Sequence, residues 1–445
     1  MFDLKELLQS GPLRDFLQKP GRSAPGVLRG ALSGIQGRLG LSRDEGVETR
    51  PVTGTERIWI AQNRIQRFFC IQMVIEGQVQ GSAKLDLDHF KDALQRATRA
   101  QPGARLRLHG SFENLVWKTD GPPPRLRVVP AGAWNGTDSE RAPFLFKKLN
   151  EAKGPGTEIV IVEGDPTRIV IRTSHAQMDG AATILFAKGL FAALRGEEPL
   201  RATAGPPTDA DIGERYRHLK PDRHDNDSPS LVGPPRGKSD RNHWVRLSVD
   251  GPVANPVSQV CLALAHSAPP EVDPRSLRFG IPVDMRAMAK CGPSSANLAG
   301  MVRLELKQAL EADDPVATLQ QQLVGKLLNG SFAAGLSQVQ AIKSVPMPLL
   351  TLGMRVVKRA LLTKDQFRVS ALVSHLGRIN LSDFSTEDFH AHKVFFIPPP
   401  MASIPVFVVL SETGRTLEIC ASAPEAFASD GRLKALLQAV AQRLS

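Results

Sequence analysis

The sequence predicts an α/β protein, an α+β sandwich in two halves of roughly 150–200 residues each, and three observations lead to this prediction. Short β-rich segments alternate with helical apolar patterns from residue 51 onward. Residues 201–243 hold six prolines and fifteen charged residues of both signs with almost no apolar periodicity, which is typical of a linker or a surface crossover. Of the 445 residues, 42% are hydrophobic and 23% charged, an ordinary globular composition.

Residues 1–50 form the first predicted element, a helical leader. Two short helical patterns, Asp3–Leu8 and Val27–Leu39, are separated by Pro12, Pro20 and Pro25. The second pattern carries arginines to one side of its apolar face, so attachment to a membrane surface is one alternative. We expect the other alternative, in which the leader packs on its own domain.

Residues 51–200 form the predicted N-terminal subdomain, in which a helix follows the first strand and a hairpin precedes a second helix. The hairpin turns at Gly164-Asp165-Pro166. The predicted strands are Cys70–Glu76, Leu106–His109, Leu115–Lys118, Leu126–Val129, Glu158–Glu163 and Arg168–Thr173, and the predicted helices lie within 85–103, capped by Asp86 or Asp88, and over Ala181–Leu194.

Residues 244–445, after the polar crossover 201–243, form the predicted C-terminal subdomain. Asp314 as a cap, Pro315 at the first position and Asn329-Gly330 as a stop define one helix. The other predicted elements are strands Leu277–Val283 and Met301–Leu306, the amphipathic helix Met347–Thr363, a hairpin of Val406–Leu410 with Thr416–Ala421, and the helix Gly431–Leu444.

Composition narrows the possible classes of protein. Four cysteines lie far apart without a CxxC pair, which argues against a disulfide framework or a zinc site. No uncharged run resembles a membrane span, and the N-terminus has acids where a signal peptide needs a basic start. These observations predict a cytoplasmic protein that binds no metal.

The chain is basic, with 56 Lys and Arg against 45 Asp and Glu, and a net charge of +11 attracts polyanions. The sequence has one tyrosine, no zinc-finger spacing and no long Lys/Arg block, so we expect no nucleic-acid partner. Phosphate-bearing cofactors and acidic proteins fit the charge equally well.

The segment Ser174-His175-Ala176-Gln177-Met178-Asp179-Gly180 carries the strongest chemical signal, because it lies between a predicted strand and a predicted helix. His175 is a candidate general base, since imidazole titrates near neutrality. Asp179 is expected to fix the local turn rather than relay protons, and Gly180 to allow a close approach that a Cβ would block. A hydrogen-bonded turn with no catalytic role would also account for these residues.

These residues resemble the HxxxD(G) signature of the chloramphenicol-acetyltransferase-like superfamily, in which many members have two consecutive histidines. Here Ser174 takes the place of the first, and His175 matches the one assigned to catalysis. Three further regions resemble segments of the same family, in the family's order. The first is Thr53–Ile60 with 101–107, and the second is Ile281–Arg286 with Asn297–Gly300. The third is Val373–Arg378, where His375 replaces an asparagine. The plant-type DFGWG motif is absent.

The resemblance implies two similar subdomains around a central tunnel, with His175 at its middle. It also implies that Arg286 pairs with Asp179 and that Asn297, with Ser174 as a second candidate, contacts the tunnel or the thioester carbonyl. The implied activity is acyl transfer from a thioester donor, which is an acyl carrier protein with its phosphopantetheine arm or acyl-coenzyme A, to a small alcohol or amine. Neither donor would be a bound cofactor, and we expect a monomer.

Two other functions stay open from sequence. One is a non-catalytic scaffold or carrier-docking protein of the same fold, and the other is a peripheral membrane acyltransferase acting on lipid. The intact motif residues His175, Asp179 and Gly180 favour catalysis over the scaffold. The absence of a compact Lys/Arg cluster for nucleotide phosphates favours a carrier-bound donor over coenzyme A.

Overall fold

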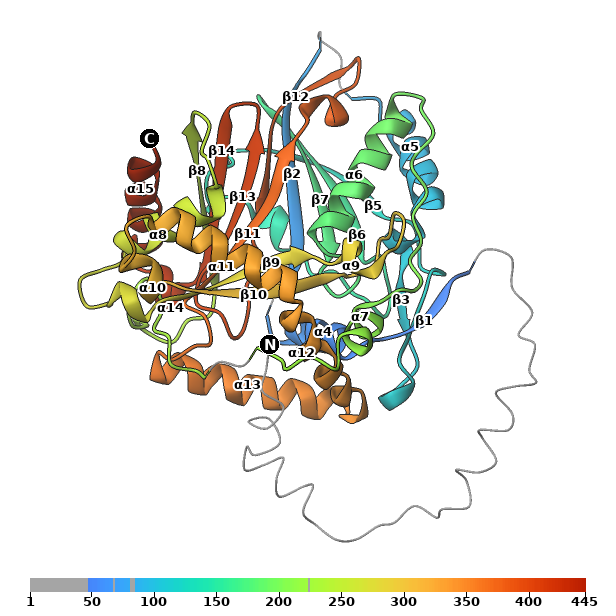
Figure 1. Ribbon diagram of the computed structural model, residues 1–445. Helices are drawn as coiled ribbons and strands as arrows, with labels where there is room; N and C mark the ends of the chain where they lie inside the picture. Colours follow the sequence, from blue (N-terminus) through green and yellow to red (C-terminus); the bar gives the residue numbers. More distant parts are fainter. Residues whose placement is uncertain (1–46, 67–68, 81–84, 223–224) are drawn as a thin grey trace, which may run out of the picture.

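The computed structural model describes residues 47–66, 69–80, 85–222 and 225–445 (Figure 1). All but the last four residues of the predicted leader 1–50 lie outside this part of the chain. The described residues form a mixed α/β structure of three sheets with helices on their outer faces, and they confirm the predicted fold class.

A five-stranded sheet forms most of the N-terminal half, in the order β12-β2-β7-β6-β5. Its hairpin, β6 and β7, is the one predicted from sequence. The bounds are β2 (Cys70–Val79), β5 (Arg125–Pro130), β6 (Thr157–Glu163), β7 (Thr167–Ser174) and β12 (Phe389–Ile397). A smaller sheet, β1-β4-β3, consists of β1 (Thr49–Pro51), β3 (Arg107–His109) and β4 (Val116–Lys118).

A six-stranded sheet forms the C-terminal half, in the order β10-β9-β11-β13-β14-β8. Its strands are β8 (Asn242–Asp250), β9 (Arg278–Asp284), β10 (Ala299–Glu305), β11 (Ala371–Ile379), β13 (Phe407–Thr413) and β14 (Thr416–Pro424). β11 runs parallel to both β9 and β13, whereas the other pairs are antiparallel.

The helices follow local signals in the sequence. Asp314 accepts a hydrogen bond from Ala317 N at the start of α11, and Gly330 ends that helix in the left-handed conformation, as predicted. The bounds are α4 (Gly54–Ile65), α5 (Leu87–Ala100), α6 (Gly180–Leu194), α7 (Asp209–Arg215), α8 (Pro256–His266), α9 (Arg286–Ala289), α10 (Lys307–Leu310), α11 (Pro315–Asn329), α12 (Ser331–Val339), α13 (Met347–Lys364), α14 (Glu425–Ala428) and α15 (Arg432–Leu444).

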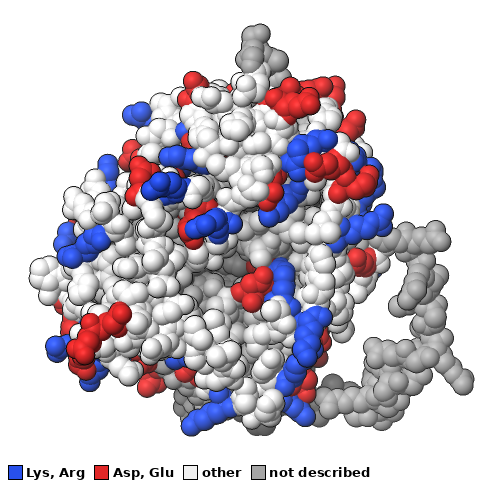
Figure 2. Space-filling model, turned by 45° about the horizontal axis from the view of Figure 1, so that its top comes forward, with Lys and Arg blue, Asp and Glu red and all other residues white. Residues whose placement is uncertain are grey.

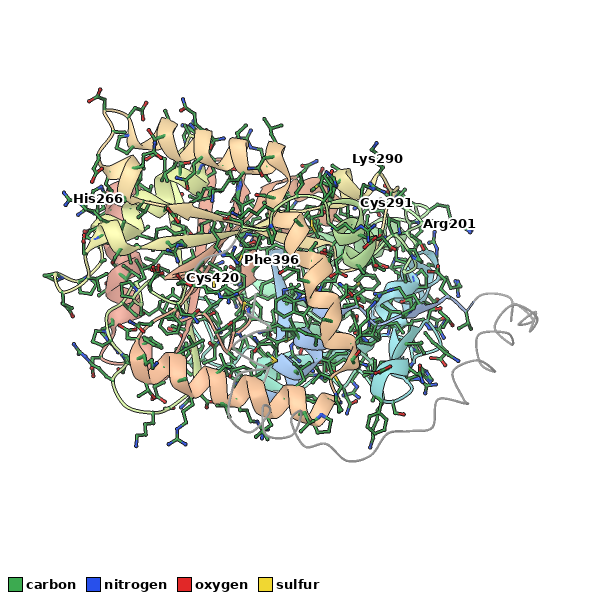
Figure 3. The ribbon with its side chains drawn as sticks, turned by 60° about the horizontal axis from the view of Figure 1, so that its bottom comes forward. Arg201, His266, Lys290, Cys291, Phe396 and Cys420 are labelled. Carbon is green, nitrogen blue, oxygen red and sulfur yellow. The ribbon has the colours of Figure 1, made fainter. Side chains whose placement is uncertain are left out.

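Strand β12 crosses between the two predicted halves. It belongs to residues 244–445 by sequence, yet it pairs antiparallel with β2 at the edge of the N-terminal sheet, and the two lie side by side at the centre of Figure 1. Figure 3 shows Phe396 of this strand in the interior of the molecule, whereas Lys290 and Arg201 lie at an edge. β12 thus belongs to the N-terminal sheet and packs against β13 and β14 of the C-terminal sheet. The subdomain boundaries expected from sequence remain a prediction.

The segment 201–243 packs more closely than a linker. It contains α7, where Asp211 accepts a hydrogen bond from Thr208 N at 2.7 Å, and α7 packs against α12. Ile212, Leu231 and Val232 are buried in the core of the C-terminal half. The prediction of a linker or a surface crossover did not anticipate this burial, because a few apolar side chains among many charged residues produce no periodic pattern.

Candidate active site

The turn between β7 and α6 carries His175 and Asp179. β7 ends at Ser174 and α6 begins at Gly180, so five residues reverse the chain. Asp179 is the N-cap of α6, and its Oδ1 accepts a hydrogen bond from Ala182 N at 2.8 Å. A carboxylate at this position satisfies a free helix N–H and complements the helix dipole.

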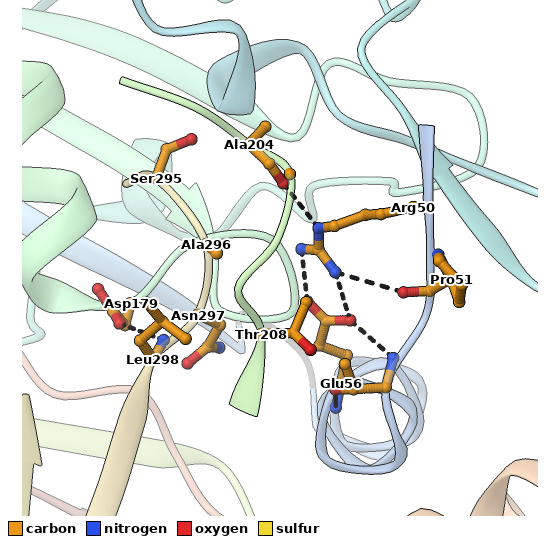
Figure 4. Close-up of polar contacts among 12 residues, drawn as sticks. Arg50, Pro51, Glu56, Asp179, Ala204, Thr208, Ser295, Ala296, Asn297 and Leu298 are labelled. Atoms are coloured by element: carbon orange, nitrogen blue, oxygen red, sulfur yellow. Dashed lines mark hydrogen bonds and ion pairs between the residues drawn. The ribbon is translucent and has the colours of Figure 1, made fainter. Parts of the chain in front are cut away.

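Asp179 also joins the turn to the C-terminal half. Arg286 donates two hydrogen bonds to its carboxylate, from one guanidinium nitrogen to Oδ2 at 3.1 Å and from the other to Oδ1 at 3.0 Å. Leu298 N donates a third to Oδ2 at 2.7 Å, which Figure 4 also shows. The side chain of Asp179 is only 4% exposed. The structure thus brings together the two residues that the resemblance pairs.

Arg286 is held in place by more than Asp179. Its guanidinium donates to the carbonyl oxygens of Ser294 and Ala296 and to Asp284 Oδ1, at 3.1, 2.9 and 2.8 Å. Burial disfavours the charged guanidinium, but the two carboxylates outweigh it and raise the pKa of Arg286. Arg286 therefore stays charged and fixes the loop 294–298 against the turn.

The imidazole of His175 is fixed by aromatic neighbours and by one amide. Its ring centroid lies 5.2 Å from that of Trp59 and 5.4 Å from that of Phe69, with interplanar angles of 19° and 12°. Asn297 Nδ2 donates a hydrogen bond to the carbonyl oxygen of His175 at 2.6 Å. The two aromatic rings, whose centroids lie 5.6 Å from each other, thus orient the imidazole, and Asn297 holds the backbone of His175.

Burial sets the protonation of His175. Desolvation lowers the pKa of the imidazole below its ordinary value of 6.5, although a hydrogen bond to its own backbone and the charge of Asp179 act in the opposite direction. Nδ1 can reach the residue's own carbonyl oxygen, to which Asn297 Nδ2 also donates, so we assign the proton to Nδ1 and attribute the 3.4 Å approach of Asn297 Nδ2 to Nδ1 to their shared acceptor. Nε2 of the neutral ring then carries a lone pair.

Ser174 and Asn297 do not make the expected contact with the tunnel. Ser174 is fully buried and its hydroxyl donates to Glu151 Oε1 at 2.9 Å. The amide of Asn297 is committed to His175, and neither residue lines the cavity described below. Both side chains instead stabilise the turn through these hydrogen bonds. Burial raises the pKa of Glu151, the partner of Ser174.

Gly180 leaves little room for a side chain. A Cβ at this residue would lie 3.1 Å from Leu376 Cδ2, closer than ordinary van der Waals contact. Leu376 belongs to β11, so the absence of a side chain lets the start of α6 approach the C-terminal sheet. Leu376 is therefore the residue whose close approach to Gly180 a Cβ would hinder.

A cavity of about 310 Å³ opens beside the turn. β9 and β11 pair only at Ala371–Phe279 and Leu372–Gly280, and residues beyond this point on both strands line the cavity. The opening thus lies where two strands of one sheet separate. Its wall is mostly apolar and includes Ile71, Ile184, Met301, Leu372, Phe396 and Phe407 together with His175.

The outer surface shows a hollow but no concentrated basic patch on the face in Figure 2. Acidic and basic side chains are interspersed there, and both stand beside the hollow. On α13, predicted as an amphipathic helix, Arg355 and Arg359 are exposed, whereas Lys358 is buried and pairs with Asp240 at 2.7 Å. The positive net charge of the chain is therefore not gathered at one site on this face.

Helix α4 positions Trp59 against His175. Its N-terminus is anchored by a buried ion pair, in which Arg50 donates to both carboxylate oxygens of Glu56 at 2.9 and 2.6 Å (Figure 4). Arg50 also donates to the carbonyl oxygen of Ala204 at 2.7 Å, and Glu56 accepts from Thr53 N at 2.9 Å. The segment that resembles the family's opening is thus a helix whose inner face forms one wall of the cavity.

The sequence did not predict three side chains that surround His175 or line the cavity. Trp59 and Phe69 contact His175, and Gln62 lines the cavity while its Oε1 accepts from Ala402 N at 3.1 Å. The only signal for Trp59 and Gln62 was their spacing of three along one helix face.

Within the described ranges, no three His, Cys, Asp or Glu side chains gather as a metal site would require. His390 and His392 both lie on the exposed face of β12. Among the helices of this same part of the chain, none combines the length and apolar character of a membrane span.

Comparison with known sequences finds similarity to an uncharacterised protein in two strains of one organism. No protein-family model matches the chain. The uncharacterised protein Rv2305 of Mycobacterium tuberculosis is 26% identical over 407 residues, a match that covers 80% of this chain and 89% of that protein. The same match is found in a second strain of that organism.

Solved structures show the fold. A mutant of the starter condensation domain of rhizomide synthetase RzmA, in complex with C8-CoA and Leu-SNAC, has a TM-score of 0.57 at 17% identity and covers 88% of this chain and 93% of its own. The first condensation domain of the calcium-dependent antibiotic synthetase, with a substrate analogue, has a TM-score of 0.59 at 14% identity over 89% and 95% of the two chains. Polyketide synthase associated protein 5 of Mycobacterium tuberculosis has a TM-score of 0.55 at 12% identity over 89% and 97%. The chain therefore has the condensation-domain fold, as the resemblance of its motifs to the chloramphenicol-acetyltransferase-like superfamily predicts.

Proposed function

We propose that this protein is an acyltransferase that moves an acyl group from a thioester donor to a hydroxyl or amine acceptor, with His175 as the general base. One observation carries the proposal: the imidazole of His175, on a turn that Asp179 and Arg286 join to the C-terminal half, lines an apolar cavity with walls from both sheets.

The reaction needs one proton carrier. As the acceptor oxygen or nitrogen attacks the thioester carbonyl, its proton moves to Nε2 of His175 and a tetrahedral intermediate forms. The carbon–sulfur bond then breaks, and the imidazolium returns the proton to the leaving thiolate. Atoms and charge balance without a covalent enzyme intermediate, and holding both substrates beside His175 contributes much of the rate.

The surroundings of His175 support this role. A lowered pKa keeps the imidazole in its basic form at neutral pH, and the contacts with Trp59, Phe69 and Asn297 restrict its orientation. Asp179 contacts Arg286 and the helix backbone, so it acts as a positioning residue and touches no reacting atom.

The donor is proposed as an acyl thioester because the cavity is apolar enough for an acyl chain and because a protein of this fold was solved with C8-CoA. The sequence favours a carrier-bound donor over coenzyme A, and both deliver the same thioester. Docking of a carrier protein should weaken steeply with salt, since surface charges are screened over about 8 Å at physiological ionic strength.

The test uses purified protein and a defined panel. Acetyl, octanoyl and palmitoyl groups are offered on coenzyme A and on a phosphopantetheinylated carrier protein, with octan-1-ol, benzyl alcohol and octylamine as acceptors. We expect an ester or amide product by mass spectrometry, and His175→Ala should reduce its rate by about 10²–10⁴-fold with the fold intact.

Two results would contradict the proposal. Retention of more than a tenth of the wild-type rate in His175→Ala would remove His175 as the base. Absence of product with every pair, together with saturable binding of the acyl carrier protein, would instead favour the non-catalytic carrier-docking protein.

A further inference from the structure

A second imidazole lines the same cavity. His375 lies on β11, between Ser374 and Leu376, and all three residues line the cavity with His175. The side chain of His375 is 23% exposed, so part of the ring is accessible. The acyl-transfer mechanism proposed above leaves this residue without a role.

Glu412 orients the ring of His375. The distance between His375 Nε2 and Glu412 Oε1 is 3.0 Å. β11 and β13 run parallel with His375 opposite Leu410, and Glu412 lies two residues further on the same face of β13. The pairing shifts register between His375 and Arg378, where Gly377 has a φ of +78°, and this irregularity lets the side chain reach along the strand to Glu412.

This contact defines the hydrogen-bonding character of the ring. A carboxylate only accepts, so the proton of the neutral imidazole lies on Nε2 and Nδ1 carries a lone pair. Burial lowers the pKa of His375, although the charge of Glu412 acts against this shift. Nδ1 is therefore the ring nitrogen left to accept a hydrogen bond.

The position of His375 relates it to the reacting centre. The next residue, Leu376, is the neighbour that a Cβ on Gly180 would meet at 3.1 Å, and Gly180 begins the helix directly after the turn that carries His175. β11 thus passes the turn from the side of the C-terminal sheet. An acceptor whose nucleophile lies at His175 would extend along this strand.

We propose that His375, oriented by Glu412, forms a second polar subsite that accepts a hydrogen bond from a second hydroxyl or N–H of the acceptor. This inference rests on the proposed acyltransferase function and specifies the acceptor as a molecule with two hydrogen-bond donors, such as a diol, one for His175 and one for His375. His375 is a positioning and specificity residue, and it takes no part in proton transfer.

The experiment measures preference among matched acceptors. Octane-1,2-diol, octane-1,3-diol and octane-1,8-diol are compared with octan-1-ol, using octanoyl-coenzyme A or the octanoyl carrier protein. We expect wild type to use one of the diols with a KM about tenfold below that of octan-1-ol, the effect of one hydrogen bond. His375→Phe should abolish this preference, so that the ratio of the KM of the diol to the KM of octan-1-ol, measured in the same variant, rises to about one.

Further variants separate the subsite from general damage. His375→Asn keeps an acceptor atom and should retain part of the preference, whereas His375→Leu, used if His375→Phe does not fold, should lose it. Arg378→Ala is the matched control, because Arg378 also lies near Glu412, at 3.6 Å, but its side chain is 74% exposed and outside the cavity.

The outcomes distinguish the two proposals. If wild type transfers acyl groups but prefers no diol, or if His375→Phe keeps the preference, the subsite is wrong and the acyltransferase function stands. A change in donor KM alone would place His375 at the donor and also overturn the inference. Absence of transfer to every acceptor would overturn the acyltransferase function itself, and the subsite with it.

Discussion

Asp179 connects two distant parts of the chain through a single carboxylate. It accepts hydrogen bonds from the first turn of α6, from Arg286 and from Leu298 N, and it is almost completely buried. A buried charge is stable only when such partners satisfy it. At the residue scale, the position of His175 therefore depends on contacts that belong to the other half of the molecule.

Asp179→Ala should lower the free energy of unfolding by about 3–5 kcal/mol, because it leaves the charge of Arg286 partly buried without its main partner. Urea unfolding measures this change, and the transfer rate should fall in parallel. Asp284→Ala is the matched control: its side chain is 49% exposed and contacts the same arginine at 2.8 Å, so its cost should be much smaller. Equal stability of the two variants would contradict the argument.

The pH dependence of transfer to a hydroxyl acceptor should reflect the lowered pKa of His175. Only the neutral imidazole acts as a base, so kcat/KM should fall as the pH decreases, with its midpoint below 6.5. The unfolded chain binds this proton more readily than the folded one, and acidification through that range should also reduce stability. A midpoint at or above pH 6.5 would show that burial does not lower the pKa of His175.

The sequence predicted some site residues and could not predict others for a physical reason. His175, Asp179 and Gly180 lie within six residues, so their relation is local. Arg286 is 107 positions from Asp179 and was named only through the resemblance. Trp59 and Phe69 reach His175 because β2, β7 and α4 meet in the folded chain, and no spacing in the sequence shows that meeting.

Elements with strong local signals were predicted closely, α11 to the residue and the strands of the β13–β14 hairpin to within three residues at each end. α11 has a cap, a proline and a terminal glycine, and the hairpin of β13 and β14 has a two-sided apolar pattern around a turn. β12 gave no comparable signal, because its register with β2 is specified by a partner more than 300 residues away. The local β-propensity of its residues therefore did not identify β12 as a strand.

At the element scale, the anchoring of α4 should contribute measurably to stability. Glu56→Gln removes the charge that Arg50 contacts, and since both side chains are 3% exposed or less, we expect a loss of about 3 kcal/mol by urea unfolding. Glu214→Gln removes a carboxylate that pairs with Arg217 on the surface, with exposed fractions of 64% and 68%, and should change little. A loss of similar size in both variants would argue against a special role for the buried pair.

At the scale of the whole molecule, the two halves share their interior. One apolar cluster combines Val74 and Val170 of the N-terminal sheet with Trp244 and Cys420 of the C-terminal sheet. Charged residues join the same surfaces, since Glu76 of β2 contacts Arg168 of β7 at 3.1 Å and also pairs with Arg246 of β8. Neither half buries these groups without the other.

This shared interior predicts that the described part of the chain unfolds as one unit, although the sequence divides it into two subdomains. Tryptophan fluorescence reports Trp59, Trp117 and Trp134 in one half and Trp244 in the other, and far-UV circular dichroism reports both sheets. We expect the two urea transitions to coincide. Glu76→Gln should shift both to lower urea by the same amount, because two buried arginines lose the charge of their common partner. Two separate transitions, or a shift of only one probe, would show that the halves fold independently and that β12 does not couple them.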